Sequence, residues 1–314
     1  MERIEVTNSI ALKKRFCKDY NLPIVIYDNP YFYERLCTID SLFDCVDRFE
    51  DFCLELSKFN NEQEYFEYYN KVKDEVINYI KSNPEYIGFS ESEFKTTTEY
   101  GKRNLYVENN DNKTFISLDM KKANFSALQH YSSEIFKNCL TWEKFIKTFT
   151  DCEHIINSKY IRQVIMGACN PKKQIKYEHY LMADLLNHLH SNINNINVYS
   201  LGEDEIILSI DNAGYSFNQL QTIVKSHPIG NTIRITMFDL HKIKGTDGWL
   251  KNIYNVGEHC ENRDIVEFKC LNSEIYHQIV KHYYNEVITP NDLVFYHNGK
   301  LAAYLEEVDN PWKE

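Results

Sequence analysis

Carboxylate side chains stand at two places where the surrounding sequence is apolar. Asp119 ends the extended run TFISLD, and the acidic run 203–205 lies between two apolar segments. Like charges that are buried together repel each other unless something compensates them. A divalent cation would do so, and Mg²⁺ prefers a few carboxylate oxygens together with substrate phosphates. The sequence therefore predicts that Asp119 and the acidic run 203–205 form a carboxylate cluster suited to Mg²⁺ or Mn²⁺, and two such ions could activate a hydroxyl and stabilise a leaving pyrophosphate.

Extended segments are needed to bring these acids together. Residues 114–119 are predicted to form a strand that delivers Asp119, paired in a hairpin with residues 104–108 through the turn at 109–112. Residues 197–200 and 205–210 are predicted strands on either side of a tight bend. A further strand is expected at 232–238, and helical segments dominate between residues 123 and 190.

A basic segment lies between the two acidic motifs. Within residues 158–180, Lys159 and Arg162 fall at helical spacing on one side, and Lys172 and Lys173 follow the helix end at Asn170-Pro171. Arginine suits bidentate phosphate contacts, and lysine acts as a point charge. These four cations are the predicted phosphate-binding residues, and a solvated basic helix face is the alternative.

Two families resemble these motifs. Residues 119–126 (DMKKANFS) resemble the DMDxFFAS motif of the Y-family (translesion) DNA polymerases, with one extra residue before the aromatic. Residues 199–208 (YSLGEDEIIL) resemble their YSxDExxL motif, with two residues inserted before the Asp-Glu pair. Residues 201–206 (LGEDEI) are also similar to the LGGDEF turn of the GGDEF nucleotidyl cyclases, with Glu203 replacing the second Gly. The resemblance covers roughly residues 114–240.

This resemblance to palm-domain nucleotidyltransferases implies roles for individual residues. Asp119 and Asp204 would bind the metal ions, with Glu205 as a third ligand or near neighbour. Palm domains of polymerases receive triphosphate-binding cations from an insertion at the position of the basic segment. The sugar of an incoming nucleotide would lie near Asn124, which could bind a 2′-hydroxyl and favour ribonucleotides. A shift of one residue would instead make Phe125 a barrier to ribose.

The rest of the chain indicates an α+β protein. Residues 1–93 are predicted to form a helical N-terminal region, including a helix at 62–82 capped by Asn60 or Asn61. Residues 94–245 would form the palm-like (ferredoxin-like) catalytic domain, an antiparallel sheet with helices and a basic helical insertion at 153–180. Residues 246–314 would form a small C-terminal α/β region that ends in a hairpin with the turn His297-Asn298-Gly299.

Composition limits the class of partner. Among 314 residues, 35 Lys and Arg against 46 Asp and Glu give a formal net charge of −11. Proteins that grip long duplex DNA usually carry a basic face, so nucleoside triphosphates, short or single-stranded nucleic acid, or a protein partner fit better. The 23 Tyr and 18 Phe, beside abundant Asn, Lys and Ile, are typical of AT-rich genomes such as those of phages and viruses.

Localisation follows from what the sequence lacks. No segment approaches the ~20 apolar residues of a membrane span, and residues 1–14 lack the apolar core of a signal peptide. The nine cysteines include no CxxC pair, which favours reduced thiols. We therefore expect a cytoplasmic protein without a membrane partner, in the host cytoplasm if the protein is viral.

Together these patterns predict an enzyme that transfers nucleotidyl groups from nucleoside triphosphates with Mg²⁺, in the manner of a polymerase or terminal transferase. A nucleotidyl cyclase or signalling-nucleotide synthase uses the same palm chemistry without a template, and the acidic net charge favours it. A non-enzymatic viral or phage interaction protein on a degenerate palm is the third possibility.

Overall fold

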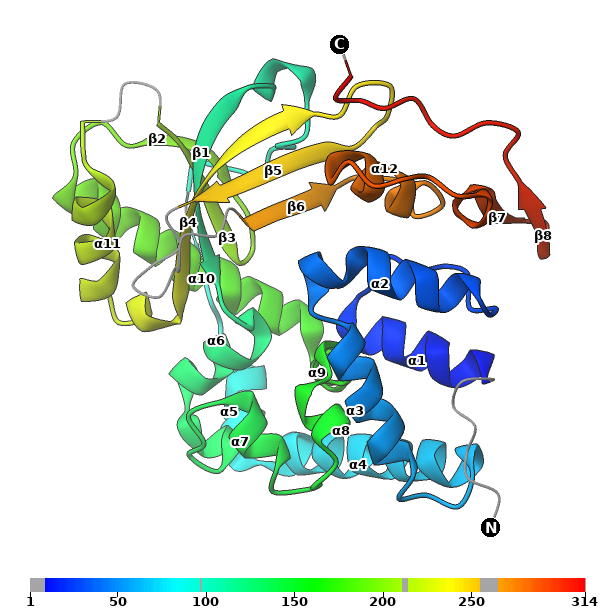
Figure 1. The fold of residues 1–314 in the computed structure, drawn as a ribbon. Coiled ribbons are helices and arrows are strands. Elements are labelled where there is room, and N and C mark those ends of the chain that lie inside the picture. Colours follow the sequence, from blue (N-terminus) through cyan, green and yellow to red (C-terminus); the bar gives the residue numbers. More distant parts are fainter. Residues whose placement is uncertain (1–8, 97, 211–213, 255–264, 314) are drawn as a thin grey trace.

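The structure is a computed structural model that describes residues 9–96, 98–210, 214–254 and 265–313. It is an α+β protein in which a helical body lies below an antiparallel sheet (Figure 1). The N-terminal residues form helices only: α1 (Ile10–Tyr20), α2 (Tyr31–Phe43), α3 (Val46–Leu56), α4 (Glu62–Ser82) and α5 (Pro84–Glu91). None of the described helices is long and apolar enough to cross a lipid bilayer.

Helix α4 illustrates how the sequence sets these elements. The side chain of Asn61 caps it by accepting from the backbone N–H of Glu64 at 2.9 Å, as the sequence predicts. Its buried residues recur every three or four positions and face the core: Tyr65, Tyr69, Val72, Val76 and Ile80. The helix ends at Ser82 because Pro84 cannot continue it, and Pro84 instead begins α5.

The described strands of the main sheet lie in the order β2-β3-β1-β4-β5-β6, and all neighbours are antiparallel. Their bounds are β1 (Lys113–Met120), β2 (Asn197–Leu201), β3 (Glu205–Ser209), β4 (Ile233–Lys242), β5 (Trp249–Tyr254) and β6 (Ile265–Lys269). The chain between β1 and β2 forms α6 (Ala123–Tyr131), α7 (Trp142–Ile146), α8 (Glu153–Asn157), α9 (Lys159–Ala168) and α10 (Pro171–Asn192). Helix α11 (Phe217–Ser226) connects β3 to β4.

The predicted hairpin between residues 104–108 and β1 is wrong. Strand β1 pairs with β3 on one edge and with β4 on the other, so neither edge is free for a third strand. Residues 104–108 are not a strand; Leu105 and Tyr106 pack against a small apolar cluster of the sheet that includes Phe115 and Trp249. Residues 23–27 form an apolar segment without strand structure, in which Ile24 and Ile26 are buried.

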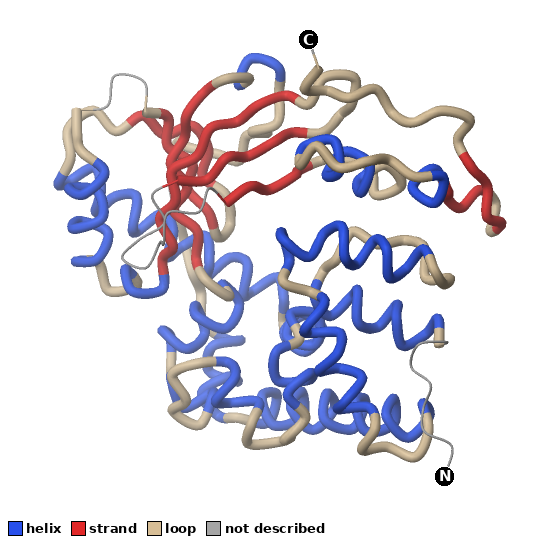
Figure 2. Tube along the Cα trace, viewed as in Figure 1, coloured by secondary structure: helices blue, strands red, loops and turns tan. Residues whose placement is uncertain are grey.

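The two faces of β1 meet different surroundings because successive side chains point to opposite sides. Ile116, Leu118 and Met120 belong to the main core, which the helices cover from one side (Figure 2). Phe115 belongs instead to the small cluster on the opposite face, and Ser117 and Asp119 follow it at alternate positions. Asp119 nevertheless lies close to the end of the strand and lines a cavity together with residues of α9 and α10.

The sheet continues past residue 245 through β5 and β6, followed by α12 (Tyr276–Tyr283) and the hairpin of β7 (Val294–His297) and β8 (Lys300–Ala303). The hairpin turn has positive φ angles at Asn298 and Gly299, which is the conformation that an Asn-Gly pair favours. This confirms the predicted hairpin.

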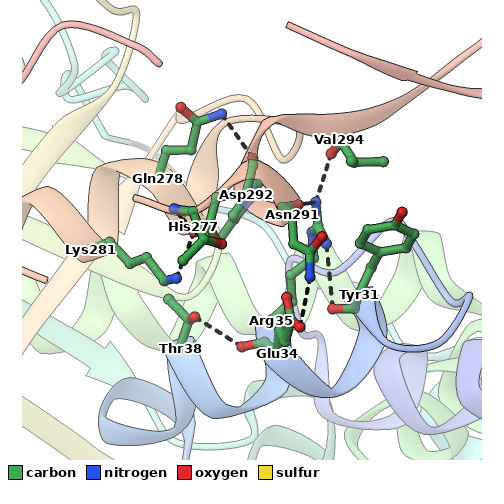
Figure 3. A network of polar contacts seen from close by, with 11 residues as sticks. Tyr31, Glu34, Arg35, Thr38, His277, Gln278, Lys281, Asn291, Asp292 and Val294 are labelled. Atoms are coloured by element: carbon green, nitrogen blue, oxygen red, sulfur yellow. Dashed lines mark hydrogen bonds and ion pairs between the residues drawn. The ribbon is translucent and has the colours of Figure 1, made fainter. Parts of the chain in front are cut away.

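The C-terminal part lies against α2, near the other end of the chain (Figure 3). The Arg35 guanidinium donates to the carbonyl oxygen of Val294 at 2.6 Å and approaches that of Asn291 at 3.4 Å. The Asn291 side chain in turn donates to Glu34 at 2.9 Å. These contacts connect the beginning and the end of the described chain.

Candidate functional site

A cavity of about 650 Å³ lies where the end of β1 meets α9 and the first turns of α10. Its acidic lining residues are Asp119, Asp204 and Glu178. Its basic lining residues are Lys121, Lys122, Lys159, Arg162 and Arg234. The cavity is therefore lined by three carboxylates and by a larger number of cationic side chains.

The two predicted acids meet because of how the strands pair. The backbone N–H of Met120 donates to the carbonyl oxygen of Asp204 at 2.9 Å, which fixes the bend after β2 beside the end of β1. Asp119 lies opposite Arg234 of β4, and their side chains form an ion pair at 2.6 Å. Burial raises the pKa of the Asp204 carboxyl, and the nearby charge of Asp119 raises it further.

Glu203 turns away from the cavity. Its carboxylate pairs with Lys102 at 2.8 Å, and this hydrogen bond lowers the pKa of Glu203. Two contacts fix the bend itself. The backbone N–H of Gly202 donates to the backbone carbonyl oxygen of Glu205 at 2.8 Å, and the ring Nδ1 of His179 lies 2.9 Å from the Gly202 carbonyl oxygen. The three acids of this run therefore have three different surroundings.

Glu205 lies beside the cavity rather than in its lining. It is the register partner of Asp119, and its carboxylate accepts from the Ser117 hydroxyl at 2.5 Å. Burial raises the pKa of Glu205, while the hydrogen bond from Ser117 and the charge of Lys251 lower it. Its role as a metal ligand stays a prediction.

Helix α9 presents Lys159 and Arg162 to the cavity from successive turns. Burial lowers the pKa of the Arg162 guanidinium, and its Nε has no hydrogen-bond partner within the described chain. A buried donor without a partner is unfavourable unless a ligand or water satisfies it. A bound anion would accept a hydrogen bond from this Nε and so remove the cost of a buried donor without a partner.

The segment after β1 forms the floor of the cavity. Lys122, the residue directly before α6, has a positive φ of 49°, which is uncommon for a residue other than glycine. Its ammonium group forms an ion pair with Glu143 of α7. Ala123 and Asn124 line the cavity, so the N-terminal turn of α6 faces it. Helix N-termini carry free N–H groups and attract anions.

Three other predicted residues are not part of the lining. Phe125 is only 4% exposed and packs on Phe136 with ring centroids 4.6 Å apart. Lys172 is exposed to solvent, and the ammonium of Lys173 lies 5.5 Å from the ring of Phe94. The roles of these three residues in ligand binding stay predictions.

Two lining residues, Glu178 and Arg234, were not predicted from the sequence. Glu178 is 7% exposed, and burial together with Asp204 and Glu203 raises its pKa to about 7. It lies on the same side of α10 as Gln174, four residues earlier, but this spacing alone does not indicate a cavity residue. Arg234 could not be found locally, because it faces Asp119 only through the register of β4 on β1.

No three His, Cys, Asp or Glu side chains in the described ranges lie close enough together to hold a metal ion by themselves. Asp119 and Asp204 nevertheless suit Mg²⁺, which is commonly bound by one or two carboxylates and completes its coordination with phosphate oxygens and water. The donor set thus fits a metal that arrives with an anionic ligand.

No protein-family model matches this chain, and searches of curated proteins and of solved structures found no match either.

Proposed function

We propose that this protein transfers nucleotidyl groups from nucleoside triphosphates in a reaction that depends on Mg²⁺ or Mn²⁺. The observation that carries the proposal is the composition of one cavity. Carboxylates from β1 and from the bend after β2 line it together with cations from α9 and from the segment that leads into α6. A metal-bound triphosphate needs both kinds of group.

Of the lining carboxylates, Asp119 and Asp204 would hold the metal ion. When bound, the ion would activate a hydroxyl and stabilise the charge on the leaving pyrophosphate. Arg234 forms an ion pair with Asp119 at 2.6 Å, and its positive charge neutralises this carboxylate when no metal is bound. If Asp119 held a metal ion, the Arg234 guanidinium would be free to bind a phosphate oxygen.

Of the lining cations, Lys159 and Arg162 would bind the triphosphate. The unpaired Nε of Arg162 supplies a donor that no described protein group uses. The N-terminal turn of α6 adds backbone N–H groups, which bind phosphate oxygens with favourable dipole orientation. Lys122 adds a further positive charge, although Glu143 already compensates it in part.

The connectivity of the sheet supports a palm-like domain. The segment β1–helices–β2–β3–α11–β4 has the spatial order β2-β3-β1-β4, which is the order of a split βαβ, ferredoxin-like arrangement. In our proposal, this arrangement brings the end of its first strand and the bend between its second and third strands to one catalytic centre.

The sugar of the nucleotide would meet Asn124 rather than Phe125. Asn124 lines the cavity, whereas Phe125 packs inside the core. An amide can donate to and accept from a ribose hydroxyl. We therefore propose that the site accepts ribonucleotides.

The test uses purified protein, labelled nucleoside triphosphates and Mg²⁺. Asp119→Asn and Asp204→Asn are each expected to lower turnover by roughly a hundredfold or more, since each removes a metal-binding charge. Glu203→Gln is the matched control, because Glu203 faces Lys102 on the outside of the same bend, and its turnover should stay near that of the natural protein. Unchanged turnover in Asp119→Asn would reject the proposal.

The same assay, run with and without a primed template, identifies the acceptor. Extension of the primer indicates a polymerase-like or terminal-transferase-like enzyme. A product formed without primer or template indicates a nucleotidyl cyclase or signalling-nucleotide synthase. Absence of both turnover and any Mg²⁺- or Mn²⁺-induced rise in melting temperature indicates a non-enzymatic interaction protein.

A further inference from the structure

A fully buried carboxylate lies in the helical body, outside the cavity. Asp19 of α1 is 0% exposed. Its Oδ1 accepts from the hydroxyl of Ser158 at 2.7 Å and from that of Tyr69 at 3.1 Å. Its Oδ2 lies 2.8 Å from the ring Nε2 of His154. A single side chain thus joins α1, α4, α8 and the residue that begins α9.

An isolated buried carboxylate is strongly unfavourable, and even a paired one commonly adds little net stability. Hydrogen bonds from α4, from α8 and from Ser158 compensate Asp19, and the guanidinium of Arg15 is 4.0 Å away. Arg15 itself donates to the Tyr69 hydroxyl at 3.1 Å. Buried polar groups of this kind define one geometry more strongly than apolar packing does, because their hydrogen bonds are directional.

The network acts directly on the start of α9. Ser158 is the N-cap of this helix: its hydroxyl oxygen accepts from the backbone N–H of Ile161 at 3.0 Å while its proton is donated to Asp19. A hydroxyl can do both at once. The next residue but one, Tyr160, lies under the Arg15 guanidinium at 4.6 Å from its ring centroid. The first turn of α9 is therefore held from two sides.

The same turn carries the cations of the candidate site. Lys159 follows Ser158 directly, and Arg162 lies one turn further along; both line the cavity. Their side chains are long, so the direction in which they point depends on where the backbone of this turn lies. A displacement of about 1 Å in such a group can weaken a reaction a hundredfold.

We propose that Asp19 and Ser158 are positioning residues that fix the start of α9, so that Lys159 and Arg162 face the cavity and bind the phosphate groups of its ligand. This inference rests on the proposed function, since it assigns the triphosphate to these two cations. It explains why a buried charge is kept in the helical body, away from the carboxylates of the sheet.

The test measures binding of inorganic tripolyphosphate by calorimetry, in the presence of Mg²⁺. Ser158→Ala removes the hydroxyl and is expected to raise the Kd roughly tenfold, because the turn is no longer fixed. Amides of residues 161–166 should exchange hydrogen faster, whereas those of α4 should not. Ser216→Ala is the matched control: Ser216 caps α11 through the N–H of Gln219 in the same way, and its loss should leave the Kd unchanged.

A second set of variants separates positioning from general stability. If the network acts through the two cations, Ser158→Ala should weaken binding no further in a Lys159→Ala, Arg162→Ala background. Ser158→Thr keeps the hydroxyl and should bind within about threefold of the natural protein. Ser158→Gly keeps most of the capping preference while removing the hydroxyl, and it replaces Ser158→Ala if that variant does not fold.

Three results would overturn the positioning role: no binding of tripolyphosphate by the natural protein, an unchanged Kd in Ser158→Ala or Ser158→Gly, or equal weakening by Ser158→Ala with and without the two cations. The expected binding pattern without any triphosphate turnover would instead retain the positioning role and reject nucleotidyl transfer.

Discussion

Glu178 is the cavity side chain that burial affects most clearly. Its pKa rises from 4.5 to about 7 because it is shielded from water and faces the charges of Asp204 and Glu203. The neutral carboxyl is therefore the preferred form in the folded protein up to about neutral pH. Above it, a third negative charge enters a site that already holds Asp119 and Asp204.

This shift has a consequence for stability. The folded state holds the Glu178 proton more tightly than the unfolded state does. This difference stabilises the folded state fully below pH 4.5, and the stabilisation is lost as pH rises through about 7. The loss corresponds to no more than roughly 3 kcal/mol. Glu178→Gln has no carboxyl to ionise and so avoids this loss. Its free energy of unfolding, measured in urea without metal, should therefore increase relative to that of the natural protein between pH 5 and pH 8.

Glu203→Gln is the control for this measurement, because Lys102 lowers the pKa of Glu203 and its contribution is instead lost as pH falls. A stability difference between Glu178→Gln and the natural protein that is the same at pH 5 and pH 8 would contradict the assigned ionisation.

The cavity was only partly readable from the sequence. Asp119 and Lys159 are set by local pattern: one ends an apolar strand, and the other lies at helical spacing in a basic segment. Phe125 was ambiguous because a single inserted residue decides which side chain of α6 faces inward. Glu178 and Arg234 reach the cavity through tertiary packing, which no short-range pattern encodes.

At the scale of elements, the connection from α11 to β4 sets the start of the strand that carries Arg234. A Cβ on Gly230 would lie 2.0 Å from the backbone oxygen of Val224, so only glycine fits this close approach. Two residues later, the carbonyl of Thr232 accepts from the backbone N–H of Lys121 at 2.9 Å. The connection therefore also fixes the segment that follows β1.

Gly230→Ala is expected to destabilise the protein by about 1–3 kcal/mol or more, because the backbone of α11 has to shift to admit the methyl group. The measurement is the midpoint of urea unfolding. Gly88→Ala, in the interior of α5 with no atom within 4 Å of the added carbon, is the control and should stabilise by about 0.5–1 kcal/mol. Equal effects of the two substitutions would show that the close approach is not a constraint.

Elements differed in how well the sequence foretold them. Helix α4 follows from its apolar period, its cap and the proline after it, all of which are local. The pairing of β1 does not: the turn-forming residues 109–112 favoured a hairpin, whereas the chain pairs β1 with strands about 90 and 120 residues later. Strand order depends on the burial of both faces at once, which local turn signals cannot report.

At the scale of the whole molecule, Arg35 connects α2 to the C-terminal segment (Figure 3). Its side chain is 5% exposed, and its donors satisfy carbonyl oxygens at positions 291 and 294. On the other side of that segment, Lys281 of α12 forms an ion pair with Asp292 at 2.7 Å. The residues around 290–294 are thus held between the helical body and the helix that follows the sheet.

Arg35→Ala should leave these carbonyl oxygens without a donor, at a loss of about 1–3 kcal/mol for each one that stays buried. We expect a lower melting temperature and preferential proteolysis within residues 285–305. Lys71→Ala, which removes an exposed ion pair at 3.9 Å on α4, should change stability by less than about 1 kcal/mol. A variant with intact stability and an unchanged cleavage pattern would refute this role of Arg35.

The contact between Arg35 and Val294 spans 259 positions of the chain. On a ribosome that adds roughly 5–20 residues per second, the acceptor is synthesised about ten seconds to one minute after the donor. During that interval the Arg35 guanidinium lacks its acceptors, the carbonyl oxygens at positions 291 and 294. Nascent chains stalled before residue 290 should therefore leave the Arg35 side chain accessible to solvent and chaperones, since this contact can form only after residue 294 has been synthesised.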